Sequence, residues 1–442
     1  MITLIWVISM KRKIYDELLN WKNSDNIKPL MVLGARQVGK TYIIKEFCSH
    51  EFKNFIYVNL FERNDIVDLY NENLNSDDKF MRLKVMLDFD IEKEDSILFI
   101  DEIQESEKLI SELKYFCENH NNVRIICAGS LLGVKLKRSK FSFPVGKVKM
   151  IDMHPMDFEE FLIALGKKVL LDEMKKCFLK NKSMGSLHDT ALNLYRLYLI
   201  SGGMPESVQS MVSNNCDVIK YDQDIIKNIV SSYFKDMDKY VTNSSEALKI
   251  ERVYNSIPFQ LSNLSNKFQY SKVESGGKAR DYETALDWLE ASNIVNKSFS
   301  VSVPEIPLKG FIENDCFKLY VSDIGILNSL LEIKYSDILN DNLSLYKGSI
   351  VENYVANQLT YKGYSLYYWQ SNGKAEVDFL LYNDDGIIPV EVKSGDNTQS
   401  KSLKIYIDKF NPKYAIRIST KDFGYDPNTK IKSVPLYATF LI

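Results

Sequence analysis

The sequence predicts an α/β protein of several domains, with a parallel β-sheet near its N-terminus and a separate α/β domain near its C-terminus. Three observations lead to this prediction. An apolar stretch at 27–33 has the pattern of a buried strand, and it runs through a glycine-containing loop into a helix that starts at Thr41. From 346 to 417 the pattern is a helix, three strands, of which the second is at 375–381, a helix and another strand. The chain of 442 residues is also longer than a domain with a single hydrophobic core usually is, so several domains are expected.

The composition is that of an ordinary globular protein, with 45% hydrophobic and 26% charged residues. The net charge of −3 excludes a protein that coats nucleic acid through its overall charge, so any such contact must come from local basic patches. The cysteines are scattered without a Cys-x-x-Cys pair, which argues against zinc fingers and disulfides and fits a reducing cytoplasm. They are Cys48, Cys117, Cys127, Cys177, Cys216 and Cys316.

Residues 1–9 form a short apolar run without the leading positive charge of a secretory signal. Met10 and a basic cluster at 11–13 follow, so the preferred interpretation is that translation begins at Met10. The alternative is that the run forms a small docking strand. Neither this run nor any other segment reaches the ~20 apolar residues of a membrane span.

The loop after the first strand has the composition of a phosphate-binding site. Gly34 and Gly39 allow backbone N–H groups to curl around phosphates at a helix N-terminus. Lys40 is expected to neutralise the β- and γ-phosphates of ATP, and the Thr41 hydroxyl to coordinate Mg²⁺. The alternative is a plain strand–helix turn, which the context disfavours. The predicted nucleotide-binding residues of the loop are Gly34, Ala35, Arg36, Gln37, Val38, Gly39, Lys40 and Thr41.

Two further strands carry the polar residues that ATP hydrolysis needs. The strand from Ser96 ends in Asp101 and Glu102, which predicts a Mg²⁺ ligand followed by a base that polarises the attacking water. Ordinary solvent-facing acids are the alternative. The strand at 123–129 ends at Ser130, a polar residue expected between these acids and the γ-phosphate. Lys40, Glu102 and Ser130 are therefore the predicted catalytic residues of an ATPase.

These motifs resemble prokaryotic AAA+ and related signal-transducing ATPases, written G-x-R-Q-x-G-K-T followed by D-E-I-Q, which here is Asp101 to Gln104. The resemblance implies a P-loop parallel sheet of the ASCE type followed by a helical lid. Residues 201–206 resemble the glycine–proline motif of that lid, which places Gly203 and Pro205 near the nucleotide. The family often has arginine where this chain has Lys147, so no arginine finger is assigned, and Arg138 is the other candidate.

The stretch 135–149 contains six basic residues and no acid. It has three interpretations: contact with a nucleic-acid backbone, contact with the ATP of a neighbouring subunit in a homo-oligomer, or a solvated loop.

A winged helix-turn-helix is predicted after the lid. Apolar residues recur at helical spacing from 245 to 261, a second helix follows at about 279–292, and 294–295 and 318–321 have the pattern of a wing. Such a module contacts DNA or serves as a protein spacer, and both remain open. The second helix is too acidic to be an obvious reader of a DNA groove.

The C-terminal region contains a second chemical constellation. Asp378 and Glu391 end up side by side if the residues between them form one hairpin, and Glu391 and Lys393 share a strand face. Two carboxylates and the Val392 carbonyl make a Mg²⁺ site, which Glu352 from the preceding helix is expected to complete. Lys393 is expected to orient or deprotonate the attacking water. The alternative is a solvent-facing Glu–Lys pair.

This constellation resembles the PD-(D/E)XK nuclease superfamily, and more closely the domain of unknown function that ends the ATPases named above. The resemblance implies a restriction-endonuclease-like α/β fold with Glu391 and Lys393 as catalytic residues. The expected domains are therefore an ATPase domain at 1–160, a lid at 161–240, a winged helix at 241–330 and a nuclease-like domain at 331–442.

The function expected from the sequence is ATP hydrolysis coupled to Mg²⁺-dependent cleavage in DNA processing or defence, with ATP and DNA or RNA as partners and no membrane. One alternative is a signalling or regulatory ATPase whose C-terminal domains bind DNA or a protein without cleavage. Another is a remodeller that holds DNA while ATP moves it.

Overall fold

The computed structural model describes residues 10–25, 27–138, 143–239, 244–263, 266–371, 375–395 and 400–442. Residues 1–9, to which the translation-start interpretation applies, lie outside these ranges, as does Lys140 of the basic stretch. The chain divides into two compact units, one of residues 11–154 with 291–293, the other of 155–290 with 294–442. The four-domain division stays a prediction.

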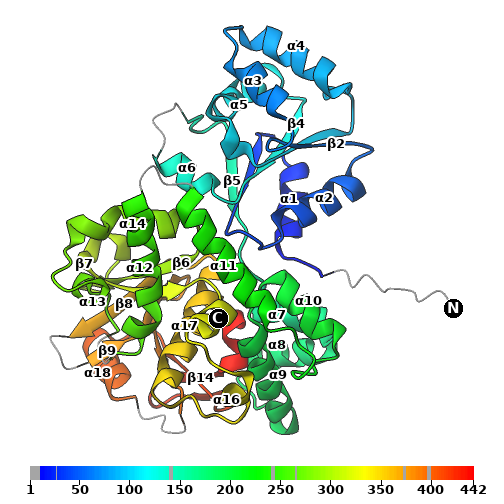
Figure 1. Cartoon of the computed structure of the whole chain (residues 1–442). Helices are drawn as coiled ribbons and strands as arrows, with labels where there is room; N and C mark the ends of the chain where they lie inside the picture. Colours follow the sequence, from blue (N-terminus) through cyan, green and yellow to red (C-terminus); the bar gives the residue numbers. More distant parts are fainter. Residues whose placement is uncertain are drawn as a thin grey trace. The chain divides into compact units, whose positions relative to one another are not determined.

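The smaller unit is built on a parallel sheet of the order β2-β3-β4-β1-β5, with α1 to α6 around it (Figure 1). The strand that precedes the loop, β1, is therefore separated from the acid-bearing β3 by β4. The helices are α1 Ile14–Lys22, α2 Lys40–Glu51, α3 Asn64–Asn71, α4 Ser76–Leu87, α5 Glu107–Asn119 and α6 Leu132–Arg138, and the strands are β1 Leu30–Leu33, β2 Asn54–Asn59, β3 Ser96–Asp101, β4 Arg124–Ala128 and β5 Lys149–Asp152.

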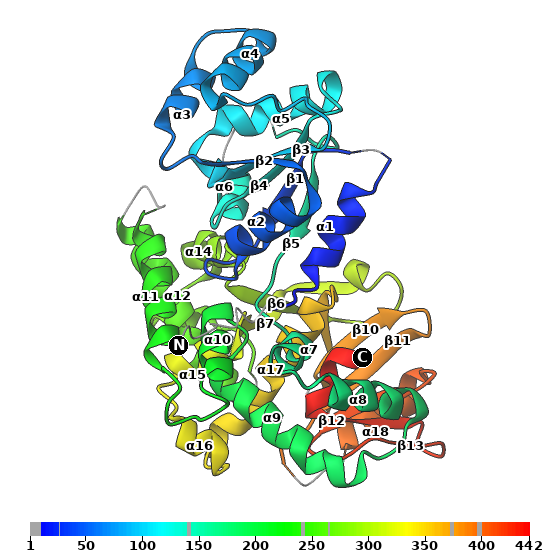
Figure 2. The same ribbon diagram turned by 90° about the vertical axis from the view of Figure 1, so that its right-hand side faces the viewer.

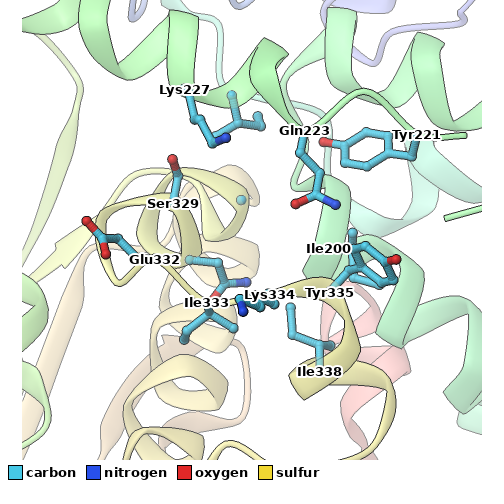
Figure 3. A pocket seen from close by; sticks show the side chains of 13 residues that line it. Ile200, Tyr221, Gln223, Lys227, Ser329, Glu332, Ile333, Lys334, Tyr335 and Ile338 are labelled. Carbon is cyan, nitrogen blue, oxygen red and sulfur yellow. The ribbon is translucent and has the colours of Figure 1, made fainter. Parts of the chain in front are cut away.

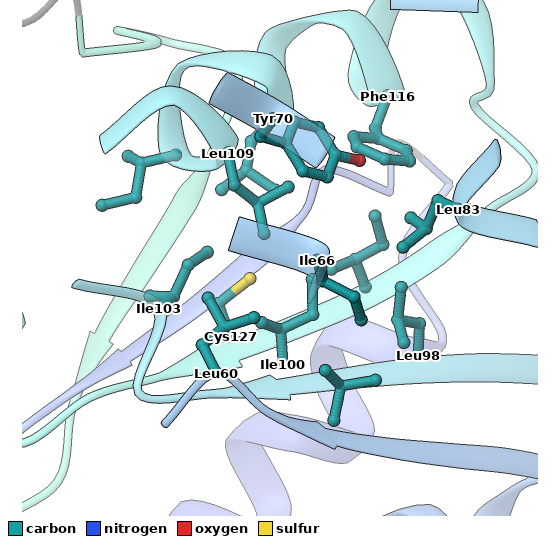
Figure 4. Close-up of a cluster of buried hydrophobic side chains, with 14 of the residues drawn as sticks. Leu60, Ile66, Tyr70, Leu83, Leu98, Ile100, Ile103, Leu109, Phe116 and Cys127 are labelled. Atoms are coloured by element: carbon teal, nitrogen blue, oxygen red, sulfur yellow. The ribbon is translucent and has the colours of Figure 1, made fainter. Parts of the chain in front are cut away.

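A hydrophobic core joins this sheet to α3, α4 and α5 (Figure 4). Each helix contributes apolar residues at helical spacing, among them Ile66, Leu83 and Leu109, which lie over Leu98 and other residues of the strands. Burial of a side chain of this size contributes about 1.5–3 kcal/mol, so this face holds the sheet and its polar strand ends in place.

The larger unit contains the other elements. Its helices are α7 Phe158–Ala164, α8 Lys168–Lys180, α9 His188–Ser201, α10 Pro205–Ser213, α11 Asp224–Lys239, α12 Ser244–Leu261, α13 Tyr270–Val273, α14 Ala279–Ala291, α15 Ile324–Leu330, α16 Tyr335–Leu339, α17 Lys347–Tyr361 and α18 Lys401–Phe410. Its strands are β6 Val295–Val301, β7 Ile312–Val321, β8 Leu366–Ser371, β9 Ala375–Val377, β10 Phe379–Asn383, β11 Gly386–Val392, β12 Ala415–Ser419, β13 Gly424–Asp426 and β14 Ile431–Pro435.

Two sheets organise this unit, one with β10, β11 and β12 and the other with β6 and β7 (Figure 2). The predicted strand at 375–381 is divided between them. Its first half, β9, pairs with β8, whereas its second half, β10, forms an antiparallel hairpin with β11. The chain bends at Asp378, whose carboxylate accepts a hydrogen bond from the Val392 N–H at 2.6 Å instead of continuing one ladder. The expectation of one continuous strand was therefore wrong.

The elements of the predicted winged helix are present in the predicted order. Helices α12 and α14 match the predicted ranges closely, and β6 pairs with β7 in an antiparallel ladder. However, β6 also pairs in parallel with β8, so the four-stranded sheet β7-β6-β8-β9 joins residues from both sides of the predicted boundary at 330. No helix of the described ranges has the length and apolar character needed to cross a membrane.

Candidate active sites

The loop between β1 and α2 has a backbone that its sequence makes possible. Gly34, Gln37 and Gly39 all have positive φ angles, of 141°, 66° and 94°. A Cβ on Gly34 would stand 2.2 Å from the Met153 carbonyl oxygen, so only glycine fits there. The loop is therefore held in a curled form from one side by the chain that follows β5.

Lys40 and Thr41, the first residues of α2, lie at the phosphate loop. The Lys40 ammonium is buried and donates to the carbonyl oxygens of Gly34 and Ala35 at 2.7 and 2.8 Å, so it lies inside the curl of the loop. The Thr41 hydroxyl donates to Asp101 Oδ2 at 2.7 Å. The two oxygen groups predicted to hold Mg²⁺ thus face each other, although they are far apart in the sequence, and this donor set fits a hard cation.

The end of β3 is fixed by neighbours that the sequence did not single out. Tyr57 on β2 donates to Asp101 Oδ2 at 3.2 Å, and burial together with Asp101 raises the pKa of this phenol to about 12. Glu102 has a left-handed backbone (φ 54°), a conformation that costs a non-glycine residue about 1 kcal/mol or more. Its Oε2 accepts from Gln104 Nε2 at 2.5 Å. Gln104 is the last residue of the D-E-I-Q motif, so the sequence could have indicated it as a partner of Glu102.

Ser130 follows β4, the strand between β1 and β3, as the prediction requires. The preceding Gly129 is pressed against the side chain of Gln104, because a Cβ on Gly129 would stand 1.9 Å from Gln104 Oε1. The segments that follow β3 and β4 therefore pack closely against each other at the carboxyl ends of these strands.

Arg12 is a part of this site that sequence reasoning missed. It is buried, and it donates to the Val38 carbonyl at 2.9 Å and to the His154 carbonyl at 2.6 Å. The guanidinium therefore ties the phosphate loop to the residues after β5. The sequence shows the basic cluster at 11–13, but it does not show that Arg12 contacts the phosphate loop.

The basic stretch is partly neutralised within its own unit. Lys135 pairs with Glu107 at 2.7 Å and Lys147 with Glu118 at 2.8 Å, and both acids lie on α5. These pairs connect the stretch to α5 of its own unit, and all three interpretations of the stretch stay predictions. An arginine finger is still not assigned.

Gly203 and Pro205, the predicted lid residues, belong to the larger unit and have a structural role there. The Gly203 N–H donates to the buried Asp323 carboxylate at 2.7 Å, and its carbonyl accepts from Met156 N–H at 2.7 Å. Pro205 is the first residue of α10, where a missing N–H costs nothing. Contact of either residue with a nucleotide stays a prediction.

In the C-terminal region the hairpin brings the predicted acids together. Phe379 is the register partner of Val390, which sets Asp378 opposite Glu391. Glu391 is buried and its Oε1 pairs with Lys393 Nζ at 2.6 Å, whereas its Oε2 is buried and accepts no hydrogen bond. A buried carboxylate oxygen without a donor is costly, and a bound cation would satisfy it. The residues present therefore fit a divalent metal ion.

Glu352, predicted as a third metal ligand, has other partners. Its Oε1 accepts from Lys318 Nζ at 2.9 Å and from the Tyr320 hydroxyl at 2.6 Å, and its carboxylate also accepts from Asn266. Lys318 donates to Glu376 as well, at 2.7 Å. Sequence reasoning placed Lys318 and Tyr320 in a wing and missed that their strand, β7, lies beside α17.

The electrostatics of this centre are those of crowded, buried charges. Burial, then Glu352, raises the pKa of Asp378 to about 8, although Lys318 and the Val392 N–H oppose the rise. Burial lowers the pKa of Lys318, but Glu352 and Glu376 outweigh it and the net shift is upward. Within the described residues, no group of three or more acids, histidines or cysteines has the arrangement of a metal cage.

A cavity of about 550 Å³ in the larger unit is lined by none of the predicted site residues (Figure 3). Tyr221, Gln223 and Lys227 line one side of it, and Glu332 and Lys334 lie on the other.

Comparison with known families identifies the smaller unit. Residues 26–162 match a family model described as an AAA domain. This part of the chain is an AAA-type ATPase domain. Residues 192–337 and 347–438 match two families described only as domains of unknown function, DUF8612 and DUF4143. The match to an AAA domain supports nucleotide binding by the loop.

Individual relatives are distant. The uncharacterised protein MJ1544 of Methanocaldococcus jannaschii is 24% identical over 415 residues, which cover 90% of this chain and 82% of that protein. The Walker-type ATPase PABY2304 of Pyrococcus abyssi is 14% identical, with 73% of this chain and 96% of that one covered and a TM-score of 0.45. The ORC2 protein of Aeropyrum pernix is 12% identical, with 75% and 92% covered and a TM-score of 0.34. These TM-scores are too low to carry a conclusion.

Proposed function

We propose that this protein hydrolyses ATP and couples hydrolysis to Mg²⁺-dependent cleavage of DNA or RNA by its C-terminal region. The observation that carries the second half of the proposal is the β10–β11 hairpin, which sets Asp378 beside Glu391 and Lys393. The first half follows from the AAA-type domain and the geometry of its loop.

In the ATPase half, each residue has one task. The loop backbone and Lys40 bind and orient the phosphates, and Thr41 and Asp101 would hold Mg²⁺. Glu102 accepts the proton of the attacking water, and Gln104, bonded to its Oε2, positions that carboxylate. Ser130, at the end of the neighbouring strand, contacts the γ-phosphate and senses its loss.

In the nuclease half, Asp378 and Glu391 would hold the metal, which supplies positive charge against the phosphate. Lys393 lies within hydrogen-bond distance of Glu391 and can orient a water molecule at the same place. A depression of about 750 Å³ beside α18 is lined by Lys404, Arg417 and Lys430, and Arg417 is the register partner of Glu391. These basic side chains suit a nucleic-acid backbone next to the acids.

A second candidate function is a regulatory ATPase whose C-terminal region binds nucleic acid without cutting it. The observation in its favour is that Lys318 and Tyr320 already occupy Glu352, one of the predicted metal ligands. A carboxylate that is already paired with a buried lysine gains less free energy from binding a metal ion, so such a centre can be stable without metal.

Cleavage of labelled single- and double-stranded DNA and RNA with Mg²⁺ separates the two functions. We expect Asp378→Asn to retain less than about 1% of wild-type cleavage, because loss of a metal ligand removes the charge that the reaction needs. The matched control is Asp384→Asn in the exposed hairpin turn, which should cut normally. Binding that survives Glu391→Ala, with wild-type protein that cuts no substrate, would establish the second candidate instead.

A further inference from the structure

Lys318 is a fully buried cation at the centre of the C-terminal acids. Its side chain has 0% exposure, and its Nζ lies 2.9 Å from Glu352 Oε1 and 2.7 Å from Glu376 Oε1. Burial of an ammonium group is costly unless carboxylates pair with it, so these contacts fix the lysine in one position. Neither carboxylate belongs to its own strand, because Glu352 lies on α17 and Glu376 on β9.

One partner of Lys318, Glu352, is also held by donors other than the lysine. Tyr320 and Asn266 both donate to Glu352, at 2.6 Å and at 3.0–3.1 Å. The charges of the centre are four carboxylates and two ammonium groups, from Glu352, Glu376, Asp378 and Glu391 and from Lys318 and Lys393. With all four carboxylates ionised, as a bound cation would favour, their sum is −2, the charge that one divalent cation neutralises.

We propose that the Lys318 ammonium replaces a second metal ion, so that the centre binds one divalent cation, at Asp378 and Glu391. Two-metal nuclease centres use both cations to neutralise carboxylates and phosphate. Here the Lys318 ammonium occupies the position between Glu352 and Glu376. The buried Glu391 Oε2, which has no hydrogen-bond partner, indicates where the one metal ion binds. The inference rests on the metal centre of the proposed function, but it concerns metal number and does not require cleavage.

Removal of the ammonium should therefore open a second metal position. In nucleotide-free, full-length protein, we expect Lys318→Met to bind one more Mn²⁺ per chain than wild type, measured by titration calorimetry. The variant should also gain several degrees more in melting temperature from Mn²⁺ than wild type, because its extra carboxylate charge is neutralised only by metal. An unchanged Mn²⁺ count in folded Lys318→Met would overturn the proposal.

Two controls separate this effect from general damage. Lys318→Arg keeps a cation and should keep the wild-type Mn²⁺ count. Lys297→Met removes a lysine from the neighbouring strand, where its Nζ lies over the rings of Phe299 and Phe317, and it should leave the count unchanged. An additional Mn²⁺ in either control would contradict a specific role for Lys318.

A further measurement uses wild-type protein and is independent of how the variants fold. The electron paramagnetic resonance spectrum of bound Mn²⁺ should be that of isolated ions, and the signal of an exchange-coupled pair would overturn the proposal. If wild type binds no Mn²⁺ at the centre but Lys318→Met gains one, Lys318 does stand in for a metal ion, whereas metal binding at Asp378 and Glu391, and with it the proposed nuclease, is overturned. The two failures are thus distinguishable.

Discussion

Replacement of Glu102 by glutamine is expected to lower the rate of ATP hydrolysis by about 10²- to 10⁴-fold and to leave ATP affinity nearly unchanged. The amide has almost the same shape as the carboxylate, but it cannot accept the proton of the attacking water. Lys40 donates to the loop carbonyl oxygens of Gly34 and Ala35, whereas Glu102 accepts from Gln104. The substitution is therefore expected to slow the hydrolysis step while the affinity for ATP is retained.

Phosphate release and fluorescent-nucleotide titration measure the two quantities separately. The matched control is Glu105→Gln, an exposed glutamate on the same short turn, which should hydrolyse ATP at the wild-type rate. Equal losses in both variants, or loss of ATP binding in Glu102→Gln alone, would show that the base has been assigned to the wrong residue.

Asp323→Ala is expected to destabilise the larger unit by about 3 kcal/mol. The buried carboxylate accepts from the N–H groups of Gly203 at 2.7 Å and Ile326 at 3.0 Å, and it caps α15. Alanine would leave these donors buried and unpaired, at about 1–3 kcal/mol each. Denaturant unfolding should show this loss, whereas Asp315→Ala, an exposed position on β7, should stay within about 0.5 kcal/mol of wild type.

The same aspartate gives a pH dependence with a definite sign. Burial raises the pKa of Asp323 to about 6, although the N–H groups of Gly203, Ile326 and Gly325 oppose the rise. Because the folded protein holds this proton more tightly than the unfolded chain, the stabilisation is complete below the unfolded pKa and is lost as pH rises towards 6. A shift of two units corresponds to about 3 kcal/mol. Asp323→Asn should lack this loss, and parallel pH profiles for the two proteins would contradict it.

Local patterns in the sequence predicted the parts of the fold that depend on neighbouring residues. The strand–loop–helix around Lys40 lies within one short segment, and the β10–β11 hairpin depends on the turn at 383–386. The order of strand, acid and serine also predicted that Asp101 and Ser130 lie at the same edge of the sheet, because parallel strands end at the same side.

The parts that the sequence did not reveal depend on contacts between distant segments. Arg12 reaches the phosphate loop and His154, and Lys318 reaches Glu352 and Glu376 only because β6 pairs with β8. A buried lysine in an apolar strand has the same sequence pattern as one that faces solvent. Its function becomes visible only when the carboxylates around it are known.

The central claim is that one chain contains an ATPase and a metal-dependent nuclease that work together. The most direct test is cleavage of labelled DNA and RNA by wild-type protein and by Lys40→Ala, each with Mg²⁺ or EDTA and with or without ATP. We predict Mg²⁺-dependent cleavage that ATP alters in wild type but not in Lys40→Ala. Wild-type protein that hydrolyses ATP yet leaves every nucleic acid intact under all of these conditions would contradict the claim.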